Sequence, residues 1–234
     1  VEKLGQVSVI CTDKSGTLTQ NQMTVRDIWV AQKRIKVTGV GYEPVGAFSP
    51  DPKGQAWEKD LLCLLEVASC CNNSRINHPS VEHPGWTSLG DQTEAALKVA
   101  AMKEGILEEA VNRILPRVHE IPFDARRKRM TTIHREVNRE IAFIKGSPRE
   151  VLQLCTKILV NNEVVLLTNQ LRAEAMGAND EYARGALRVL ALARRDLPPR
   201  EGAYTAENIE KDLTFLGLMA MMDPPRPQVE KAVQ

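Results

Sequence analysis

One aspartate, Asp13, lies where a short apolar run gives way to a loop rich in small polar residues. Residues 7–12 are mostly apolar, which is typical of a strand buried on both faces of a parallel sheet, and Cys11 is expected to pack within it. Ligands of open α/β sheets bind beyond the carboxyl ends of such strands. Because carboxylates can form aspartyl phosphates, the sequence predicts that Asp13 is a nucleophile toward phosphate. Lys14 could offset phosphate charge, and Gly16 could let backbone N–H groups approach an oxyanion.

The full run around Asp13 is more specific than the aspartate alone. Residues 13–19 read Asp-Lys-Ser-Gly-Thr-Leu-Thr. They resemble the phosphorylation motif of the P-type cation-transporting ATPases, which usually reads Asp-Lys-Thr-Gly-Thr-Leu-Thr. Ser15 keeps the hydroxyl group and the backbone carbonyl of the usual threonine and loses a methyl group, so we expect weaker packing and unchanged chemistry.

This resemblance implies a phosphate-binding loop and a metal ion. Asp13 would accept the γ-phosphate of ATP, and Mg²⁺ would be bound by Asp13 and by the backbone carbonyl of Ser15. The loop around the phosphate would consist of Lys14, Ser15, Gly16 and Thr17.

Composition narrows the class of protein. The 234 residues allow one large domain or one and a half smaller ones. A net charge of +1 and the lack of a basic, aromatic-rich face argue against a nucleic-acid partner. No apolar run approaches the length of about 18 residues expected of a membrane span. Five cysteines without a Cys-x-x-Cys pair suggest reduced thiols.

Hydrophobic periodicity divides the middle of the chain into helices and strands. Helices are predicted over residues 57–72, 91–105, 148–154 and 168–185. Strands are predicted over residues 26–30, 34–37, 117–121, 129–134, 140–145, 157–160, 163–167, 187–194 and 213–221. Because neighbouring strands form hairpins, we expect an α+β fold in which helices pack on one face of an antiparallel, twisted sheet.

The end of the chain carries a second family signature. Residues 223–226 read Asp-Pro-Pro-Arg, and Pro227 is a favoured first residue of a helix. This segment again resembles the P-type ATPases, where it is the return hinge to the phosphorylation domain. The resemblance implies that residues 24–221 form a nucleotide-binding domain, inserted into a Rossmann-like, HAD-type phosphorylation domain. Residues 1–23 and 222–234 would be short parts of that second domain.

Two further segments predict contacts with the base of a nucleotide. Glu94 lies in the first turn of the helix that Asp91 caps, where it could simply stabilise the helix dipole. Phe123 could be a core residue, and residues 126–129 a solvated basic turn. The resemblance implies instead that Glu94 accepts a hydrogen bond from the adenine amino group and that Phe123 stacks on adenine. Lys128 would lie near the ring or the phosphates.

Two more segments predict the rest of the nucleotide site. Lys145 and Gly146 end an apolar strand, and the glycine allows close backbone approach and leaves the lysine at a pocket floor. They resemble the family's Lys-Gly-Ala-Pro-Glu signature, with Ser147 in place of the alanine and Arg149 in place of the glutamate. Arg188 is a single charge in an apolar strand and could be an edge residue reaching water. The resemblance implies that its guanidinium binds the nucleotide phosphates.

The order and spacing of these segments are similar to the type II, calcium-pump-like branch over essentially the whole chain. The resemblance implies the ATP-binding domain of an ATP-driven cation transporter, at the cytoplasmic face of a membrane protein. We expect the fragment itself to be soluble and to bind nucleotide without turning it over. Its partners would be the phosphorylation, actuator and transmembrane domains of the pump. Ala125 stands where that branch often has an arginine, so Arg126 or Arg127 would have to compensate.

Two other functions remain open from the sequence. A soluble phosphatase of the haloacid-dehalogenase superfamily shares the aspartate nucleophile, but it usually has a second aspartate two residues later, where Ser15 stands. A non-catalytic interaction domain could use the basic turn of residues 126–129 to bind anionic partners.

Overall fold

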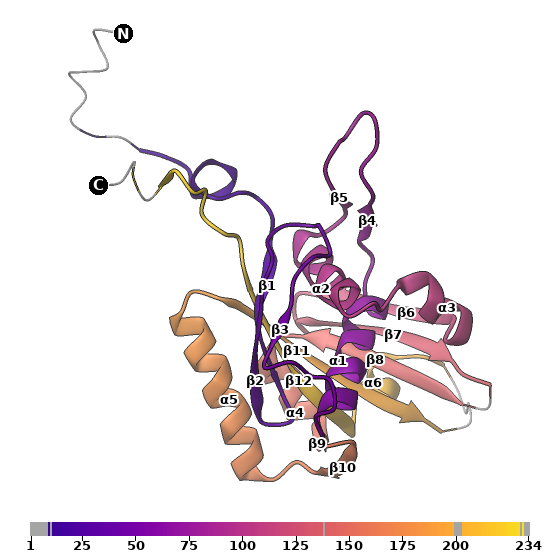
Figure 1. The fold of residues 1–234 in the computed structure, drawn as a ribbon. Coiled ribbons are helices and arrows are strands. Elements are labelled where there is room, and N and C mark those ends of the chain that lie inside the picture. Colours follow the sequence, from indigo (N-terminus) through magenta and orange to yellow (C-terminus); the bar gives the residue numbers. More distant parts are fainter. Residues whose placement is uncertain (1–8, 10, 138, 199–202, 230, 232–234) are drawn as a thin grey trace, which may run out of the picture.

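A computed structural model describes residues 9, 11–137, 139–198, 203–229 and 231 (Figure 1). Most strands join one sheet in the order β3-β2-β1-β12-β11-β8-β7-β6, and β9 and β10 continue from β12. These strands are β1 (Thr24–Val30), β2 (Lys33–Val37), β3 (Phe48–Ser49), β6 (Arg117–Asp124), β7 (Arg129–Arg135), β8 (Glu140–Gly146), β9 (Cys155–Val160), β10 (Glu163–Leu166), β11 (Arg188–Leu197) and β12 (Leu213–Met222). The short strands β4 (Arg75–Asn77) and β5 (Thr87–Leu89) form a separate hairpin.

The helices agree closely with the periodicity of the sequence. They are α1 (Glu58–Cys70), α2 (Gln92–Lys103), α3 (Glu108–Ile114), α4 (Pro148–Leu154), α5 (Asn169–Arg184) and α6 (Ala206–Ile209). The prediction for α4 is confirmed at both ends, and α1, α2 and α5 differ from prediction by a few residues at most. Helix α3 was not predicted, since its seven residues offer too short a window for a periodic pattern.

The α+β class and the antiparallel sheet are confirmed. Among the described strands, the pairing of β12 with β9 is the one parallel contact. Asn161 and Asn162 form the two-residue turn between β9 and β10, with φ angles of 52° and 66°. Both angles are positive, as a type I′ hairpin turn requires.

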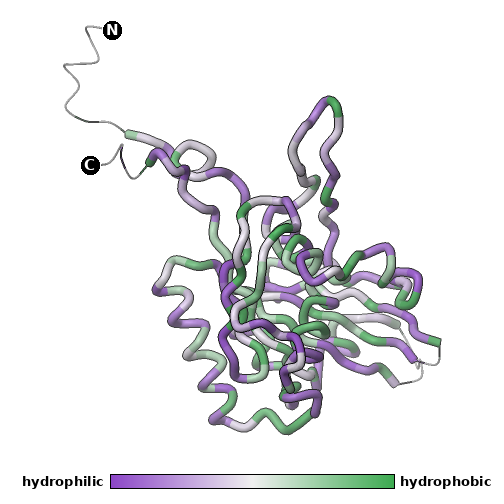
Figure 2. The backbone as a smooth tube through the Cα atoms, in the orientation of Figure 1, coloured by the Kyte–Doolittle hydropathy of each residue, from purple (hydrophilic) through white to green (hydrophobic). Residues whose placement is uncertain are grey.

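The prediction that helices cover one face of the sheet is wrong. Helices α1 and α2 pack on one face, and α4 and α5 pack on the other (Figure 1). The central strand β12 explains the difference, because its residues are apolar at nearly every position and nine of the ten are buried. A strand that is apolar on both sides needs cover on both sides. In Figure 2 hydrophobic residues gather accordingly along the central strands and α1.

The strand expected before Asp13 is not found in the described residues. Val9, Cys11 and Thr12 form no strand and are exposed, with Val9 at 73%. Within the described chain no other strand pairs with this run, and an isolated apolar run has nothing to pack against. The expected packing of Cys11 in a core strand is therefore wrong for this structure. The remaining residues of that run, 7, 8 and 10, lie outside the described residues.

The two ends of the described chain run side by side away from the sheet (Figure 1). Gln20 N donates to Pro224 O at 3.0 Å, and Arg226 N donates to Leu18 O at 2.9 Å. The Asp223 carboxylate accepts from the backbone N–H of Gln22 at 3.1 Å and from the Thr19 hydroxyl. The helix expected from Pro227 falls largely outside the described residues.

We expect Gly217→Ala to destabilise the protein by about 1–3 kcal/mol, the usual cost of overpacking a core. A Cβ at this position of β12 would lie 2.2 Å from Trp29 O and 2.5 Å from Leu64 Cδ1. Gly177→Ala is the matched control, since a Cβ there in α5 meets nothing within 4 Å and should stabilise the helix by about 1 kcal/mol. Urea denaturation of both variants checks this, and equal stability of Gly217→Ala and the parent would contradict it.

Candidate functional site

A cavity of about 300 Å³ opens between the start of α2 and the ends of β6, β7, β8 and β11. Five residues predicted from sequence to bind nucleotide line it together, although they come from four separate elements. These are Glu94, Phe123, Lys145, Gly146 and Arg188. The cavity is completed by four residues that the sequence did not assign to a ligand: Asp91, Thr93, Met130 and Leu190.

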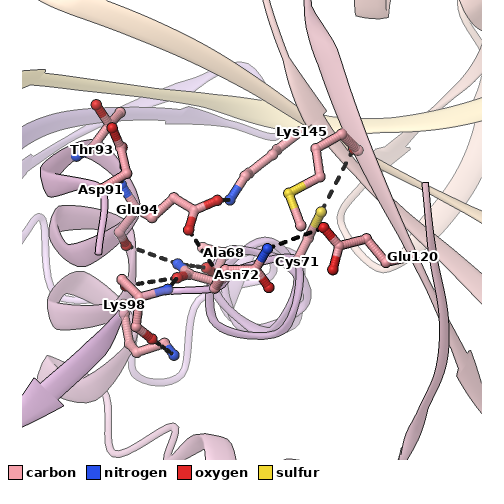
Figure 3. Close-up of polar contacts among 12 residues, drawn as sticks. Ala68, Cys71, Asn72, Asp91, Thr93, Glu94, Lys98, Glu120 and Lys145 are labelled. Atoms are coloured by element: carbon pink, nitrogen blue, oxygen red, sulfur yellow. Dashed lines mark hydrogen bonds and ion pairs between the residues drawn. The ribbon is translucent and has the colours of Figure 1, made fainter. Parts of the chain in front are cut away.

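The floor of the cavity is an ion pair. Lys145 Nζ lies 2.5 Å from Glu94 Oε1, and the two side chains are only 8% and 15% exposed. Glu94 Oε2 accepts a second hydrogen bond from the backbone N–H of Asn73, at 2.8 Å. Figure 3 shows the ammonium of Lys145 reaching from its strand toward the helix that carries Glu94. A largely buried lysine is thus neutralised by a carboxylate that is itself fixed by the backbone.

Glu94 is held in place by the residues that join α1 to α2. Asp91 caps α2, accepting from the backbone N–H groups of Thr93 at 2.9 Å and Glu94 at 3.0 Å. The buried Asn72 side chain donates to Glu94 O at 2.8 Å and to Ala68 O at 3.0 Å (Figure 3). The end of α1 and the start of α2 therefore share one amide group, which fixes the position of Glu94. The cap by Asp91 was predicted, but the role of Asn72 had no sequence signal.

The walls of the cavity are apolar and its rim is charged. Phe123 is 63% exposed, which is unusual for a phenylalanine and leaves its ring available at the opening. Met130 is buried, and Leu190 is half-buried on β11. Gly146 is required by close packing, because a Cβ there would lie 2.5 Å from Lys128 O and 2.5 Å from Arg129 Cβ. Arg188 is exposed at the start of β11, a central strand, so the edge-strand interpretation of this arginine is wrong.

Lys128 is not brought into this group of residues. Its Nζ lies 3.1 Å from Glu150 Oε1, and its side chain is more than half exposed. Its two neighbours in the basic turn are also engaged, since the buried Glu210 lies 2.5 Å from Arg127 and 2.7 Å from Arg129. Arg127 also donates to Pro122 O at 2.7 Å, so its guanidinium is already engaged within the described chain. Glu210 carried no sequence signal, because it lies some 80 residues from the turn that it binds.

Asp13 lies outside the cavity. No residue of the loop around it belongs to the cavity lining, and Asp13 is exposed. Its Oδ1 accepts from the backbone N–H of Lys14 at 2.7 Å. Residues 14–19 form a turn that is closed by a hydrogen bond from Thr19 N to Lys14 O at 3.2 Å; Ser15 and Gly16 are not helical, and Gly16 has φ of +77°. In the part of the chain that the structure describes, no cluster of three or more His, Cys, Asp or Glu residues could hold a metal ion.

A buried histidine supports the strand that carries Met130. His134 lies on the same face of β7, with Nδ1 3.0 Å from Leu115 O and Nε2 2.9 Å from Thr132 Oγ1. These contacts fit a neutral ring that donates through Nδ1 and accepts from the threonine hydroxyl. Burial lowers the pKa of His134, because the charged form loses its hydration.

The fold and the cavity define a class of protein, the nucleotide-binding N domain of the P-type cation ATPases. Residues 60–228 match the family described as "P-type ATPase, cytoplasmic domain N", and this chain belongs to that family. The match favours this class over a soluble phosphatase. The engagement of Arg127 and Arg129 with Glu210 also weakens the case for a basic interaction surface.

Three curated relatives align with the whole of this chain. It is 39% identical to the "Calcium-transporting ATPase" of Bacillus subtilis, covering 100% of this chain and 26% of that protein. It is 36% identical to "Cation-transporting ATPase pma1" of Synechocystis sp., with 100% and 26% covered. It is 34% identical to "Calcium-transporting ATPase 1" of Lactococcus lactis, with 100% and 24% covered. The chain thus spans about a quarter of the length of these relatives. None of its described helices has the length and apolar character needed to cross a membrane.

His134 should make stability depend on pH. An ordinary histidine has a pKa of 6.5, whereas that of His134 is lower in the folded state. As pH falls below 6.5, the unfolded state therefore binds a proton that the folded state does not yet bind. The free energy of unfolding should therefore fall by up to about 1.4 kcal/mol per pH unit from this residue alone. Denaturation at pH 7.5 and pH 5.5 should show a smaller loss in His134→Gln. The control His83→Gln, at an exposed position, should keep the full loss, and identical pH dependence in all three proteins would refute this role.

Proposed function

We propose that the 300 Å³ cavity binds ATP and that this chain presents the nucleotide for transfer of its γ-phosphate to Asp13 in a longer cation pump. The observation that carries the proposal is the convergence of Glu94, Phe123, Lys145, Gly146 and Arg188 on one cavity. These residues are spread over almost a hundred positions of the sequence, and the fold alone brings them together.

In this proposal each part of the cavity has a distinct role. The exposed ring of Phe123 stacks on adenine, and such stacking contributes about 1–3 kcal/mol per base. Glu94 retains lone pairs beyond those used by Lys145 and Asn73, so it accepts from the adenine amino group. Arg188 extends from the rim toward the phosphates, to which a guanidinium can donate two parallel hydrogen bonds. Lys128 contributes only as a charge near the phosphates, because its ammonium faces Glu150.

Phosphoryl transfer would require the cavity and Asp13 to approach each other. Asp13 lies on the segment that precedes β1 and not in the cavity, so the N domain would have to close over it. The other domains of the pump would also take part in this motion. Transfer of this kind depends on positioning and charge neutralisation more than on covalent chemistry by the protein. The supporting loop would be Lys14, Ser15, Gly16 and Thr17. We place this chemistry at the cytoplasmic face of the membrane.

Mg²⁺ fits this loop in part. Mg²⁺ is commonly held by one or two carboxylates together with phosphate oxygens and water. Asp13 supplies one carboxylate and the exposed residue Ser15 a backbone carbonyl, and no cluster of three or more His, Cys, Asp or Glu residues is found around them among the described residues. These two residues would hold the ion, which would offset the charge of the phosphates when bound. The isolated chain therefore binds nucleotide without turning it over.

Phe123→Ala should weaken ATP binding about 10- to 100-fold through loss of stacking. Phe123→Trp should retain it, because any aromatic face can stack on a base. The control is Leu166→Ala, at an apolar residue of β10 that is likewise exposed but lies outside the cavity. Isothermal titration calorimetry of the four proteins measures the effect. Equal affinity in Phe123→Ala and the parent would place the base elsewhere.

Removal of Mg²⁺ should change nucleotide affinity by no more than about twofold, since stacking and the contact with Glu94 need no metal. Titrations with ATP, ADP and AMP in EDTA measure this, with Asp13→Asn as a second variant that should also leave affinity unchanged. If binding disappeared in EDTA, the phosphates and their metal ion would be the main determinant of affinity, and the assignment of the cavity to adenine would fail.

A further inference from the structure

A second and larger cavity, of about 530 Å³, lies between α1 and α3 at the far end of β11. It shares no lining residue with the proposed nucleotide cavity. Its volume falls within the range of about 300–1,000 Å³ that is typical of small-molecule sites. No sequence pattern predicted this cavity, because α3 forms one of its walls and was not predicted.

One wall of this cavity is apolar and open to solvent. Leu62 of α1 faces a row of apolar residues on and before α3, which are Ile106, Leu107, Val111 and Ile114. Leu107 is 52% exposed and Ile114 is 71% exposed, whereas Ile106 and Val111 are half-buried against the core, so the outer part of the row is open to solvent. Single exposed apolar residues are common, but several around one cavity indicate a binding surface.

The opposite side of the cavity holds Arg194, which makes a hydrogen bond to a thiol and no close ion pair among the described residues. Arg194 Nη1 donates to Cys63 Sγ at 3.1 Å, and no ion pair among the described residues includes Arg194. Burial raises the pKa of the Cys63 thiol to about 11, so this acceptor is uncharged. Glu66 lines the same cavity; burial raises the pKa of its carboxyl group, and the charge of Arg194 acts in the opposite direction. Lys59 adds a second cation to the lining.

We propose that this cavity binds a small amphipathic carboxylate, with its apolar chain along α1 and α3 and its carboxylate on Arg194. A guanidinium pairs with a carboxylate through two parallel hydrogen bonds, and a thiol occupies only part of that capacity. A ligand with an apolar body and one negative charge matches both sides of the cavity. A phosphate without an apolar chain would leave the wall of α3 uncovered, and a neutral apolar ligand would form no ion pair with Arg194.

Strand β11 contributes residues to both cavities, which have no lining residue in common. Alternate residues of a strand face the same side, so Arg188, Leu190, Leu192 and Arg194 lie on one face of β11. Arg188 and Leu190 line the nucleotide cavity, Leu192 is buried in the core with α1, and Arg194 lines the second cavity. The two ligands are therefore expected to bind at the same time.

The test is a calorimetric titration of this chain with hexanoate, octanoate and decanoate below their micelle concentrations. We expect one saturable site, and about two- to fourfold tighter binding for each added methylene group that is buried. Arg194→Gln should weaken octanoate binding about tenfold or more through loss of the charged hydrogen bonds. Octanol should bind weakly, and its binding should not change in Arg194→Gln.

Two further variants and a competition experiment with ATP serve as controls for this test. Ile114→Gln changes an exposed residue, so it should fold normally and flatten the dependence on chain length. Leu166→Gln, on β10 outside the cavity, should bind octanoate like the parent. Saturating ATP should not displace octanoate. The proposal is overturned if no saturable site is found at millimolar octanoate, if Arg194→Gln and Ile114→Gln both bind like the parent, or if ATP competes. The first two outcomes do not depend on whether ATP binds as proposed above.

Discussion

β1 and β12, the sheet's first and last strands in sequence, are hydrogen-bonded to each other, and the rest of the architecture depends on this pairing. Thr24 at the start of β1 lies opposite Met222 at the end of β12, so the chain enters and leaves the domain at one point. The segment before β1 and the segment after β12 then stay together through the bridge between Thr19 and Pro225 and through the hydrogen bonds that Asp223 accepts. A domain tethered at one paired neck can turn as a unit. The proposed approach of the nucleotide cavity to Asp13 requires a motion of this kind.

The same sheet explains the electrostatics of the nucleotide cavity. Lys145 at the end of β8 reaches Glu94 on α2, and Asn72 fixes α2 to the end of α1. Because the lysine is neutralised within the floor, the deepest part of the cavity carries no net charge from this pair. Such a floor suits an uncharged base, whereas the exposed Arg188 at the rim suits phosphates. The charge distribution thus supports the orientation of ATP in our proposal, with adenine inside and the phosphates at the opening.

Local chemistry made much of this fold predictable, and non-local packing limited the rest. The cap at Asp91, the turn at Asn161-Asn162 and the helix starting at Pro148 each follow from residues close in sequence. Five of the six residues assigned to the nucleotide line one cavity. They could be predicted because family motifs carry information that hydrophobic periodicity does not. The cover on both faces of β12, the exposure of Cys11 and the partner of Lys128 all depend on segments distant in sequence. No local pattern could have indicated them.

The basic turn shows how a single distant residue changes the interpretation of a motif. In the sequence, residues 126–129 form a run of four cations beside Phe123, which suggests a surface that attracts phosphates. In the structure, Glu210 holds Arg127 and Arg129, and Thr131 also donates to it at 2.8 Å. A buried carboxylate with fewer partners would be strongly unfavourable, so these arginines stabilise the fold by neutralising Glu210. Their hydrogen-bonding capacity is then only partly available to a ligand. In our proposal, with Ala125 in the place of another cation, the affinity of the cavity for nucleotide would depend mainly on stacking by Phe123 and on Arg188.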